Sequence, residues 1–195
     1  MGWRVITMTS DEQLTWEPWQ EEYRYGAFYL FPPLEIALVV NELRLRYDPR
    51  SAAICDAHVS LSEPLTGPLL DLQLDEMLAA LSAVTPFSIT LGPLTQIGSH
   101  PGVVLGISPE EPFFALRDVV HSTSIFAGCE LSRAKRSPHM TVAEFISHEE
   151  ARDLLAEVST GDVGGTFLCD HLVYAVPDTS FHFEPVLTLT LGNLT

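Results

Sequence analysis

The sequence predicts an α+β protein of two similar halves, whose antiparallel sheets surround a central cleft. Short apolar runs and helical periods follow one another along residues 25–97 and again along 103–176, each time as strand, helix, strand, helix, strand. A histidine falls in the middle strand of each copy, at His58 and at His139. The 195 residues, 46% of them hydrophobic, suffice to bury a sizeable core. We therefore expect an internal duplication that folds as one compact unit.

The first half follows a polar stretch, residues 1–24, which we expect to be an N-terminal arm that packs on the domain through Trp16 and Trp19. The elements of the first half are predicted from the hydrophobic period and from the Pro, Gly and Asp residues that end helices and strands. They are strand 25–31, helix 34–47, strand 54–65, helix 74–84 and strand 87–98.

The second half is predicted by the same rules. Its elements are strand 103–108, helix 113–128, strand 138–145, helix 147–159 and strands 167–176 and 183–192. Ser147 with Glu150 three positions later is the pattern of a capping box that opens a helix. We expect a single domain over residues 25–195, with a first lobe over about 25–97 and a second over about 103–192.

Charge and cysteine content exclude several classes of function. The 26 acidic and 10 basic residues give a net charge of −16, which disfavours non-specific binding to DNA or RNA. Three cysteines without a CxxC pair argue against a disulfide framework and a zinc site, and predict a reducing, cytoplasmic location. No apolar run approaches the roughly 20 residues that span a bilayer. We expect a monomer without membrane association.

Both middle strands read histidine, apolar, hydroxyl, apolar, as HVSL and HMTV. Because strand residues two apart share a face, His58 should point with Ser60, and His139 with Thr141. Composition predicts roughly 0.2 such tetrads by chance in this chain, whereas two occur, in matching positions of the duplication. Each half therefore offers one titratable ring beside one hydrogen-bond donor.

These motifs resemble those of the two-histidine (2H) phosphoesterase superfamily, which includes 2′-5′ RNA ligase-like proteins and cyclic nucleotide phosphodiesterases. The resemblance covers roughly residues 25–192 and includes AFYLF, LRLRYDP and AHVSLSEPL. Ser60 stands where the family often has threonine, a change that keeps the hydroxyl. The arm lies outside the resemblance.

The resemblance implies an enzyme that acts on a 2′,3′-cyclic phosphate or a 2′-5′ linkage of an RNA end or small nucleotide, without metal or cofactor. His58 and His139 would be the acid and base, in an order that the sequence does not give, and Ser60 and Thr141 would hold the phosphate. These roles agree with what two histidines and two hydroxyls can do near neutral pH.

Basic residues just before the second motif are further candidates for phosphate binding. Arg133, Lys135 and Arg136 are three of the 10 basic residues of the chain and lie within four positions. Arginine can grip two phosphate oxygens at once. The alternative, a solvated loop that keeps the protein soluble, is about equally compatible with this run.

The sequence context of the remaining histidines predicts structural roles for them. His121 reads as a helix-surface residue, His100 as a turn residue and His148 as the start of a helix. His171 and Asp170 alternate in a strand and should not join one site. Two other functions stay open: a module that binds such nucleotides without turnover, and a metal hydrolase that uses the spare histidines.

Overall fold

The computed structural model describes residues 16–132, 136–158 and 163–192. The helices are α1 (Leu34–Tyr47), α2 (Pro49–Ile54), α3 (Asp71–Leu81), α4 (Glu110–His121) and α5 (His148–Val158), with 3-10 turns η1 (Glu21–Tyr23) and η2 (Ser124–Phe126). The strands are β1 (Ala27–Leu30), β2 (Val59–Ser60), β3 (Phe87–Gln96), β4 (Val103–Ser108), β5 (His139–Ala143), β6 (Gly165–Cys169), β7 (His171–Pro177) and β8 (Phe183–Thr190).

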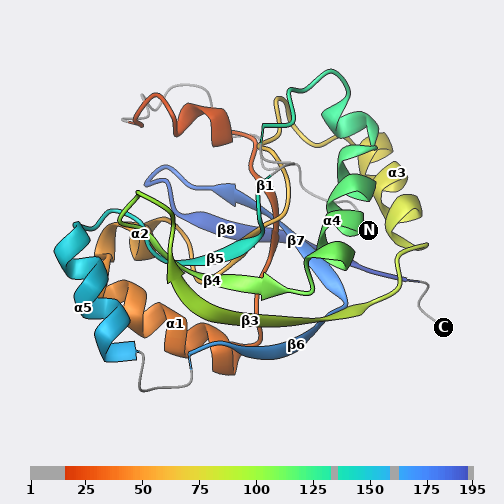
Figure 1. Ribbon diagram of the computed structural model, residues 1–195. Coiled ribbons are helices and arrows are strands. Elements are labelled where there is room, and N and C mark those ends of the chain that lie inside the picture. Colours follow the sequence, from red (N-terminus) through yellow and green to blue (C-terminus); the bar gives the residue numbers. More distant parts are fainter. Residues whose placement is uncertain (1–15, 133–135, 159–162, 193–195) are drawn as a thin grey trace.

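The strands form one curled antiparallel sheet in the order β6-β3-β4-β5-β2-β1-β7-β8 (Figure 1). The fold class is therefore as predicted, but the two expected sheets are joined through the pair β2 and β5. The prediction that each lobe is continuous in sequence is wrong. β3 pairs with β4 and β6, whereas β7 pairs with β1 and β8. One half of the sheet thus takes β3 from the first half of the chain, and the other half takes β7 and β8 from the second.

Loop length explains this exchange. β3 and β4 are consecutive strands joined by a short loop, residues 97–102, and short loops join antiparallel neighbours. The two repeats are therefore linked by a hairpin, which carries the last strand of the first repeat into the sheet of the second. In Figure 1, α1, α2 and α5 gather on one side of the molecule, and α3 with α4 on the other.

Two predicted strands were wrong in their extent. In the expected strand 54–65, only Val59 and Ser60 form a ladder. A short helix that the sequence did not predict, α2, ends at Ile54; Asp48 caps its start, and the Asp48 Oδ1 accepts the Ser51 N–H at 3.0 Å. The expected strand 167–176 is two strands that meet at Asp170. By contrast, the predicted capping box at Ser147 is confirmed: the Glu150 N–H donates to the Ser147 Oγ at 3.2 Å, and the Ser147 N–H donates to the Glu150 carboxylate at 2.7 Å.

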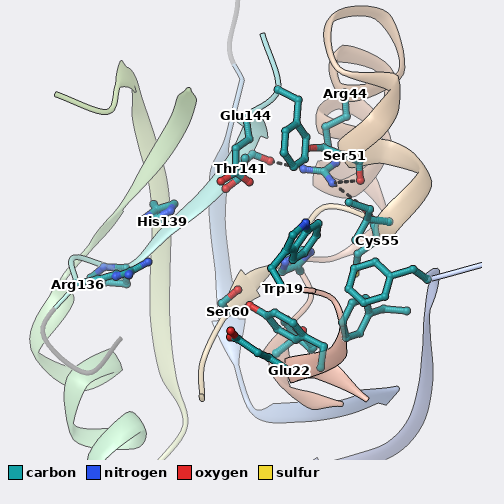
Figure 2. A pocket seen from close by; sticks show the side chains of 18 of the residues that line it. Trp19, Glu22, Arg44, Ser51, Cys55, Ser60, Arg136, His139, Thr141 and Glu144 are labelled. Atoms are coloured by element: carbon teal, nitrogen blue, oxygen red, sulfur yellow. Dashed lines mark hydrogen bonds between the residues drawn. The ribbon is translucent and has the colours of Figure 1, made fainter. Parts of the chain in front are cut away.

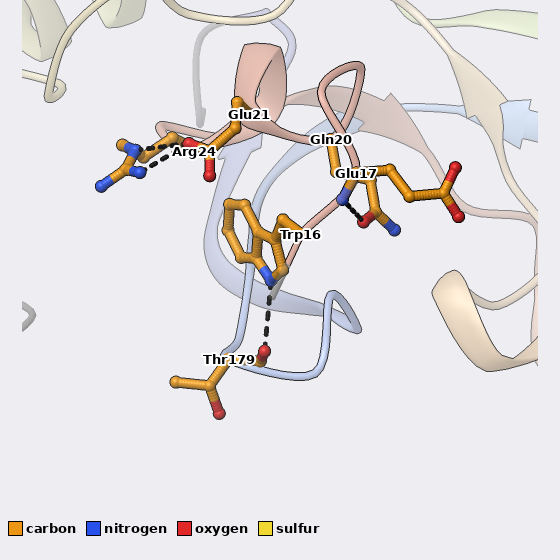
Figure 3. A network of polar contacts seen from close by, with 6 residues as sticks. All are labelled: Trp16, Glu17, Gln20, Glu21, Arg24 and Thr179. Carbon is orange, nitrogen blue, oxygen red and sulfur yellow. Dashed lines mark hydrogen bonds and ion pairs between the residues drawn. The ribbon is translucent and has the colours of Figure 1, made fainter. Parts of the chain in front are cut away.

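The described part of the arm, residues 16–24, packs on the hairpin between β7 and β8. The Trp16 indole N–H donates to the Thr179 carbonyl at 3.1 Å (Figure 3), and its ring meets that of Phe181 edge-on at 5.2 Å. These rings belong to a small aromatic cluster with Tyr29 and Phe183, separate from the main core. The arm is thereby fixed beside the central strands.

Candidate active site

The two histidine motifs face each other across the centre of the sheet. β2 and β5 pair antiparallel with Val59 opposite Met140, the central residue of each motif. Because the strands run in opposite directions, His58 lies across from Thr141, and Ser60 lies across from His139. Val59 and Met140 are fully buried on the core face, which places the four polar side chains together on the other face. Each histidine thus sits beside the hydroxyl of the other half.

The same local hydrogen bond orients both rings. Nδ1 of His58 bonds the Asp56 carbonyl at 2.6 Å, and Nδ1 of His139 bonds the Ser137 carbonyl at 2.9 Å, each two residues upstream. Since a carbonyl only accepts, Nδ1 carries the proton in both rings. Nε2 is therefore the atom that each ring offers to a ligand.

The motif face opens into a cleft of about 490 Å³, a size suited to a small organic ligand. His58, Ser60, His139, Thr141 and Arg136 all line it, so the structure brings these five predicted residues together. Figure 2 labels the last four of them in the cleft. The lining also includes Trp19, Glu22, Tyr23, Tyr29, Arg44, Arg117, Glu144, Phe145, Phe181 and Phe183. The other two predicted phosphate-binding residues, Arg133 and Lys135, lie outside the described residues.

His58 sits in an apolar environment. The Tyr29 ring meets it edge-on at 4.9 Å, and the Phe31 ring lies at 6.0 Å. Burial, and to a lesser degree the positive charge of Arg44, lowers the pKa of His58 from 6.5 to about 4. The imidazole is therefore neutral at neutral pH and can accept a proton at Nε2.

Two buried arginines, which sequence reasoning missed, fix the backbone behind the motifs. Arg44 of α1 donates from Nη1 to the Thr141 carbonyl at 2.6 Å, and from Nη2 to the carbonyls of Ser51 and Cys55 at 2.8 Å each. It is only 3% exposed. A residue of the first half therefore holds the motif strand of the second (Figure 2).

Arg117 of α4 makes the equivalent hydrogen bonds to the first motif strand. Its Nη2 donates to the Ser60 carbonyl at 3.3 Å, its Nε to the Leu61 carbonyl at 3.1 Å and its Nη1 to the Arg136 carbonyl at 3.0 Å. A residue of the second half thus holds the motif strand of the first, together with the segment that carries Arg136. The two arginines fix the spacing between the halves of the site.

A signal for both arginines exists in the sequence. Arg44 follows Ile36 and Val40 at intervals of four, on the buried stripe of α1. Arg117 follows Phe113 at the same interval on the buried stripe of α4. A charged residue on an apolar helical face must find buried partners, and here those partners are carbonyls of the central strands.

The other histidines lie outside the cleft lining. His100 is in a turn and His148 begins α5, as predicted. His121 is not at the surface but buried; its Nε2 accepts the Glu63 N–H at 3.2 Å. Asp170 and His171 do not alternate between two faces as predicted: their side chains are 2.6 Å apart, because the strand breaks at Asp170. Neither residue lines the cleft.

All three cysteines are free, and two of them are buried. Burial raises the pKa of the Cys55 thiol, which lines the cleft, to about 12. This thiol is therefore not a nucleophile near neutral pH. Within the described ranges, no group of three or more His, Cys, Asp or Glu side chains converges as a metal site requires, and no helix there is long and apolar enough to cross a membrane.

Comparison with known proteins places this arrangement in a class. The fold matches that of Escherichia coli LigT in complex with 3′-AMP, with a TM-score of 0.60, 16% identity and coverage of 87% of this chain and 99% of that one. A second crystal structure, of a phosphoesterase, gives a TM-score of 0.57 at 16% identity, over 87% and 99% of the two chains. The fold is thus the one that these two structures share.

Sequence comparison then gives the family. A family model described as the 2′-5′ RNA ligase superfamily matches residues 32–180, which is most of the chain. The chain belongs to this superfamily, and the predicted resemblance is confirmed. A candidate phosphoesterase of Bacillus pumilus is 26% identical over 165 residues, covering 81% of this chain and 92% of its relative. Another, from Bacillus cytotoxicus, is 25% identical over 171 residues, covering 84% and 96%. This membership supports phosphoesterase activity.

Proposed function

We propose that the protein is a metal-independent phosphoesterase that hydrolyses a 2′,3′-cyclic phosphate, or a 2′-5′ phosphodiester, of an RNA end or a small nucleotide. The observation that carries this proposal is the placement of two histidines on one face of one strand pair, each with Nε2 available, in a single cleft. In-line displacement at phosphorus needs a base and an acid on opposite sides of the reacting atom, and two facing imidazoles meet that need.

The low pKa of His58 supports its assignment as the base. Nε2 of His58 takes a proton from water, the water oxygen attacks phosphorus, and the bond from phosphorus to one ribose oxygen breaks. That oxygen takes its proton from Nε2 of His139. The product is a ribose phosphomonoester, and the two rings have exchanged protonation states. The negative charge of a bound phosphate raises the proton affinity of His58 and so strengthens this base.

The remaining residues hold the phosphate. Within the described part of the chain, the hydroxyls of Ser60 and Thr141 have no hydrogen-bond partner, so both can donate to non-bridging oxygens. Arg136 is exposed at the cleft and adds positive charge beside His139. A ribose hydroxyl can attack in place of water in the same geometry: its oxygen bonds to phosphorus as one ribose oxygen of the cyclic phosphate leaves, and the product is a ligated phosphodiester.

Hydrolysis in the presence of a chelator tests the proposal. The purified protein is incubated with 2′,3′-cyclic mononucleotides, ADP-ribose cyclic phosphate and 2′-5′ oligoadenylate, and products are separated by chromatography. We expect turnover that EDTA does not reduce. His58→Ala and His139→Ala should each lower kcat by about 100-fold or more, whereas His148→Ala, which changes an exposed histidine outside the cleft, should not.

Three results would contradict the proposal. Binding without turnover would make the protein a nucleotide-binding module of the same fold. Activity that disappears in EDTA would indicate a metal hydrolase. Near-normal turnover by either single histidine variant, with its fold intact, would exclude the paired mechanism.

A further inference from the structure

The arm, residues 16–24, runs along one end of the cleft and is held there at two places. Trp16 anchors it to the β7–β8 hairpin through the Thr179 carbonyl. Glu17 pairs with Arg50 at 2.8 Å, and the Arg50 guanidinium lies 4.1 Å from the centre of the Phe145 ring on the cleft rim. The arm therefore spans from the hairpin to the segment just after β5. It lies outside the part of the chain that the family model matches.

Trp19 is the arm residue best placed to meet a ligand. It lines the cleft and is 36% exposed, although it contacts the rings of Phe181 and Tyr23 edge-on. Its indole N–H already donates to the Glu17 carboxylate at 2.8 Å, so the donor is used and the ring orientation is fixed. The indole therefore offers a ligand its π surface, which suits stacking of a planar group.

Charge in the cleft limits the rest of the ligand. Among the described lining residues, Arg136 is the only exposed cation, since the guanidinium groups of Arg44 and Arg117 are buried against carbonyls. The carboxylates Glu22 and Glu144 also line the cleft. Figure 2 shows Arg136 beside His139, away from Trp19 and Glu22. This distribution accommodates one phosphate near the histidines and disfavours a second one near the arm.

We propose that Trp19 is a base-binding subsite, and that the ligand is a single nucleoside, free or at the end of an RNA, with one phosphate on its ribose. This inference rests on the proposed function for the position of the phosphate. The base stacks on the indole while the phosphate lies over the motif face. The arm lines this end of the cleft, so we expect a free or terminal nucleoside there in preference to an internal RNA segment that would have to continue past the arm.

Binding of the hydrolysis product tests the subsite without requiring turnover. Calorimetry gives the Kd of adenosine 2′-monophosphate and of a base-free analogue, 1-O-methylribose 2-phosphate. We expect Trp19→Ala to weaken binding of the nucleotide by about 5- to 100-fold and to bring its Kd close to that of the base-free analogue. Trp19→Phe keeps an aromatic face and should retain most of the affinity.

Tyr25→Ala is the matched control. Tyr25 belongs to the same part of the chain and is 37% exposed, but it does not line the cleft. This variant should bind the nucleotide as the unmodified protein does. Thermal unfolding of each variant shows whether the fold is intact.

The outcomes separate this inference from the proposed function. An equal loss of affinity for both ligands in Trp19→Ala, unchanged nucleotide binding in that variant, or no nucleotide binding by the unmodified protein would overturn the subsite. Nucleotide binding that depends on Trp19 but leads to no hydrolysis would support the subsite and refute the enzyme.

Discussion

Replacement of Arg44 by methionine should change both the stability of the protein and the titration of His58. The guanidinium gives three hydrogen bonds to carbonyls at 2.6–2.8 Å, and methionine gives none. Three lost bonds at about 1.5 kcal/mol each amount to about 4–5 kcal/mol. Removal of a buried cation offsets part of this, because burial lowers the pKa of the Arg44 guanidinium and thus opposes its charge. We expect unfolding to cost about 2–4 kcal/mol less in Arg44→Met, measured by urea denaturation.

The same substitution should raise the pKa of His58. Burial is the larger cause of the low pKa and persists, so the value should rise above about 4 and stay below 6.5. Arg44→Lys separates charge from geometry: an ammonium keeps the positive charge but does not reproduce the planar fork of donors. The lysine variant should therefore lose stability while the pKa of His58 stays low.

Histidine-ring NMR titration between pH 3.5 and 7.5 measures the pKa of His58 in each variant. Arg46→Met is the control, because Arg46 lies two residues further along α1 in an exposed ion pair with Glu157 and should change stability by less than about 1 kcal/mol. Equal pKa values of His58 in the methionine variant and the unmodified protein would refute the electrostatic role of Arg44. An equally large rise in the lysine variant would show that geometry, and not charge, causes the shift.

Three further predictions concern other parts of the site and fold. Because the pKa of His58 is lowered on folding, the folded state favours the neutral form of this ring. Up to about 3 kcal/mol of the free energy of unfolding should therefore be present above pH 6.5 and lost as the pH falls to 4. His58→Gln should flatten this part of the stability profile measured by urea denaturation. Thr141→Val keeps the side-chain shape but removes the hydroxyl, and should lower kcat on a 2′,3′-cyclic nucleotide by about 100-fold; an unchanged kcat would remove Thr141 from the phosphate site. Gly26→Ala should destabilise by about 2–4 kcal/mol in urea, since Gly26 has φ +74° and an added Cβ would lie 2.2 Å from the Ala175 carbonyl oxygen; a loss below about 1 kcal/mol would show that the turn can relax.

Local patterns in the sequence predicted the elements and the motif face. The bounds of α1 follow from its helical period between Pro33 and the Asp48-Pro49 pair. The shared face of His58 and Ser60 follows from strand alternation alone, even though only two residues of β2 form a ladder. Duplication then predicted that the second motif would occupy an equivalent place. These inferences need no knowledge of which strands pair.

Long-range pairing could not be predicted in the same way. The exchange of β3 and β7 between the halves depends on contacts between segments far apart in the chain, and hydrophobic period does not encode the partner of a strand. The burial of His121 has a similar origin: its helical position is set locally, but the backbone N–H of Glu63 that it accepts comes from the other half. The arginines were missed because a local pattern shows an apolar stripe without showing which carbonyls lie beneath it.

The two histidines occupy nearly equivalent positions, so the differences between their surroundings indicate how their roles could differ. Two histidines in identical surroundings would share one protonation state on average, and an acid–base pair needs two different states. The backbone orients both rings in the same way, because Nδ1 of each bonds the carbonyl of the residue two positions upstream, Asp56 or Ser137. What differs is the wall around His58, where the aromatic cluster containing Tyr29 extends from the arm and the β7–β8 hairpin.

In the proposed function, the arm would contribute to the chemistry as well as to binding. The cluster that seats Trp19 beside the cleft is the same one that packs Tyr29 against His58 and so helps to bury one side of that ring. The proposed base subsite at Trp19 and the ring of Tyr29 that packs on His58 thus belong to one cluster, whereas Figure 2 shows Arg136 away from Trp19. If this coupling holds, a variant that loosens the cluster at a residue outside the cleft lining, such as Trp16→Ala, should raise the pKa of His58 toward 6.5, because the ring becomes less buried. An unchanged pKa of His58 in that variant would show that the aromatic side chains around His58 keep their places without the contacts of the arm.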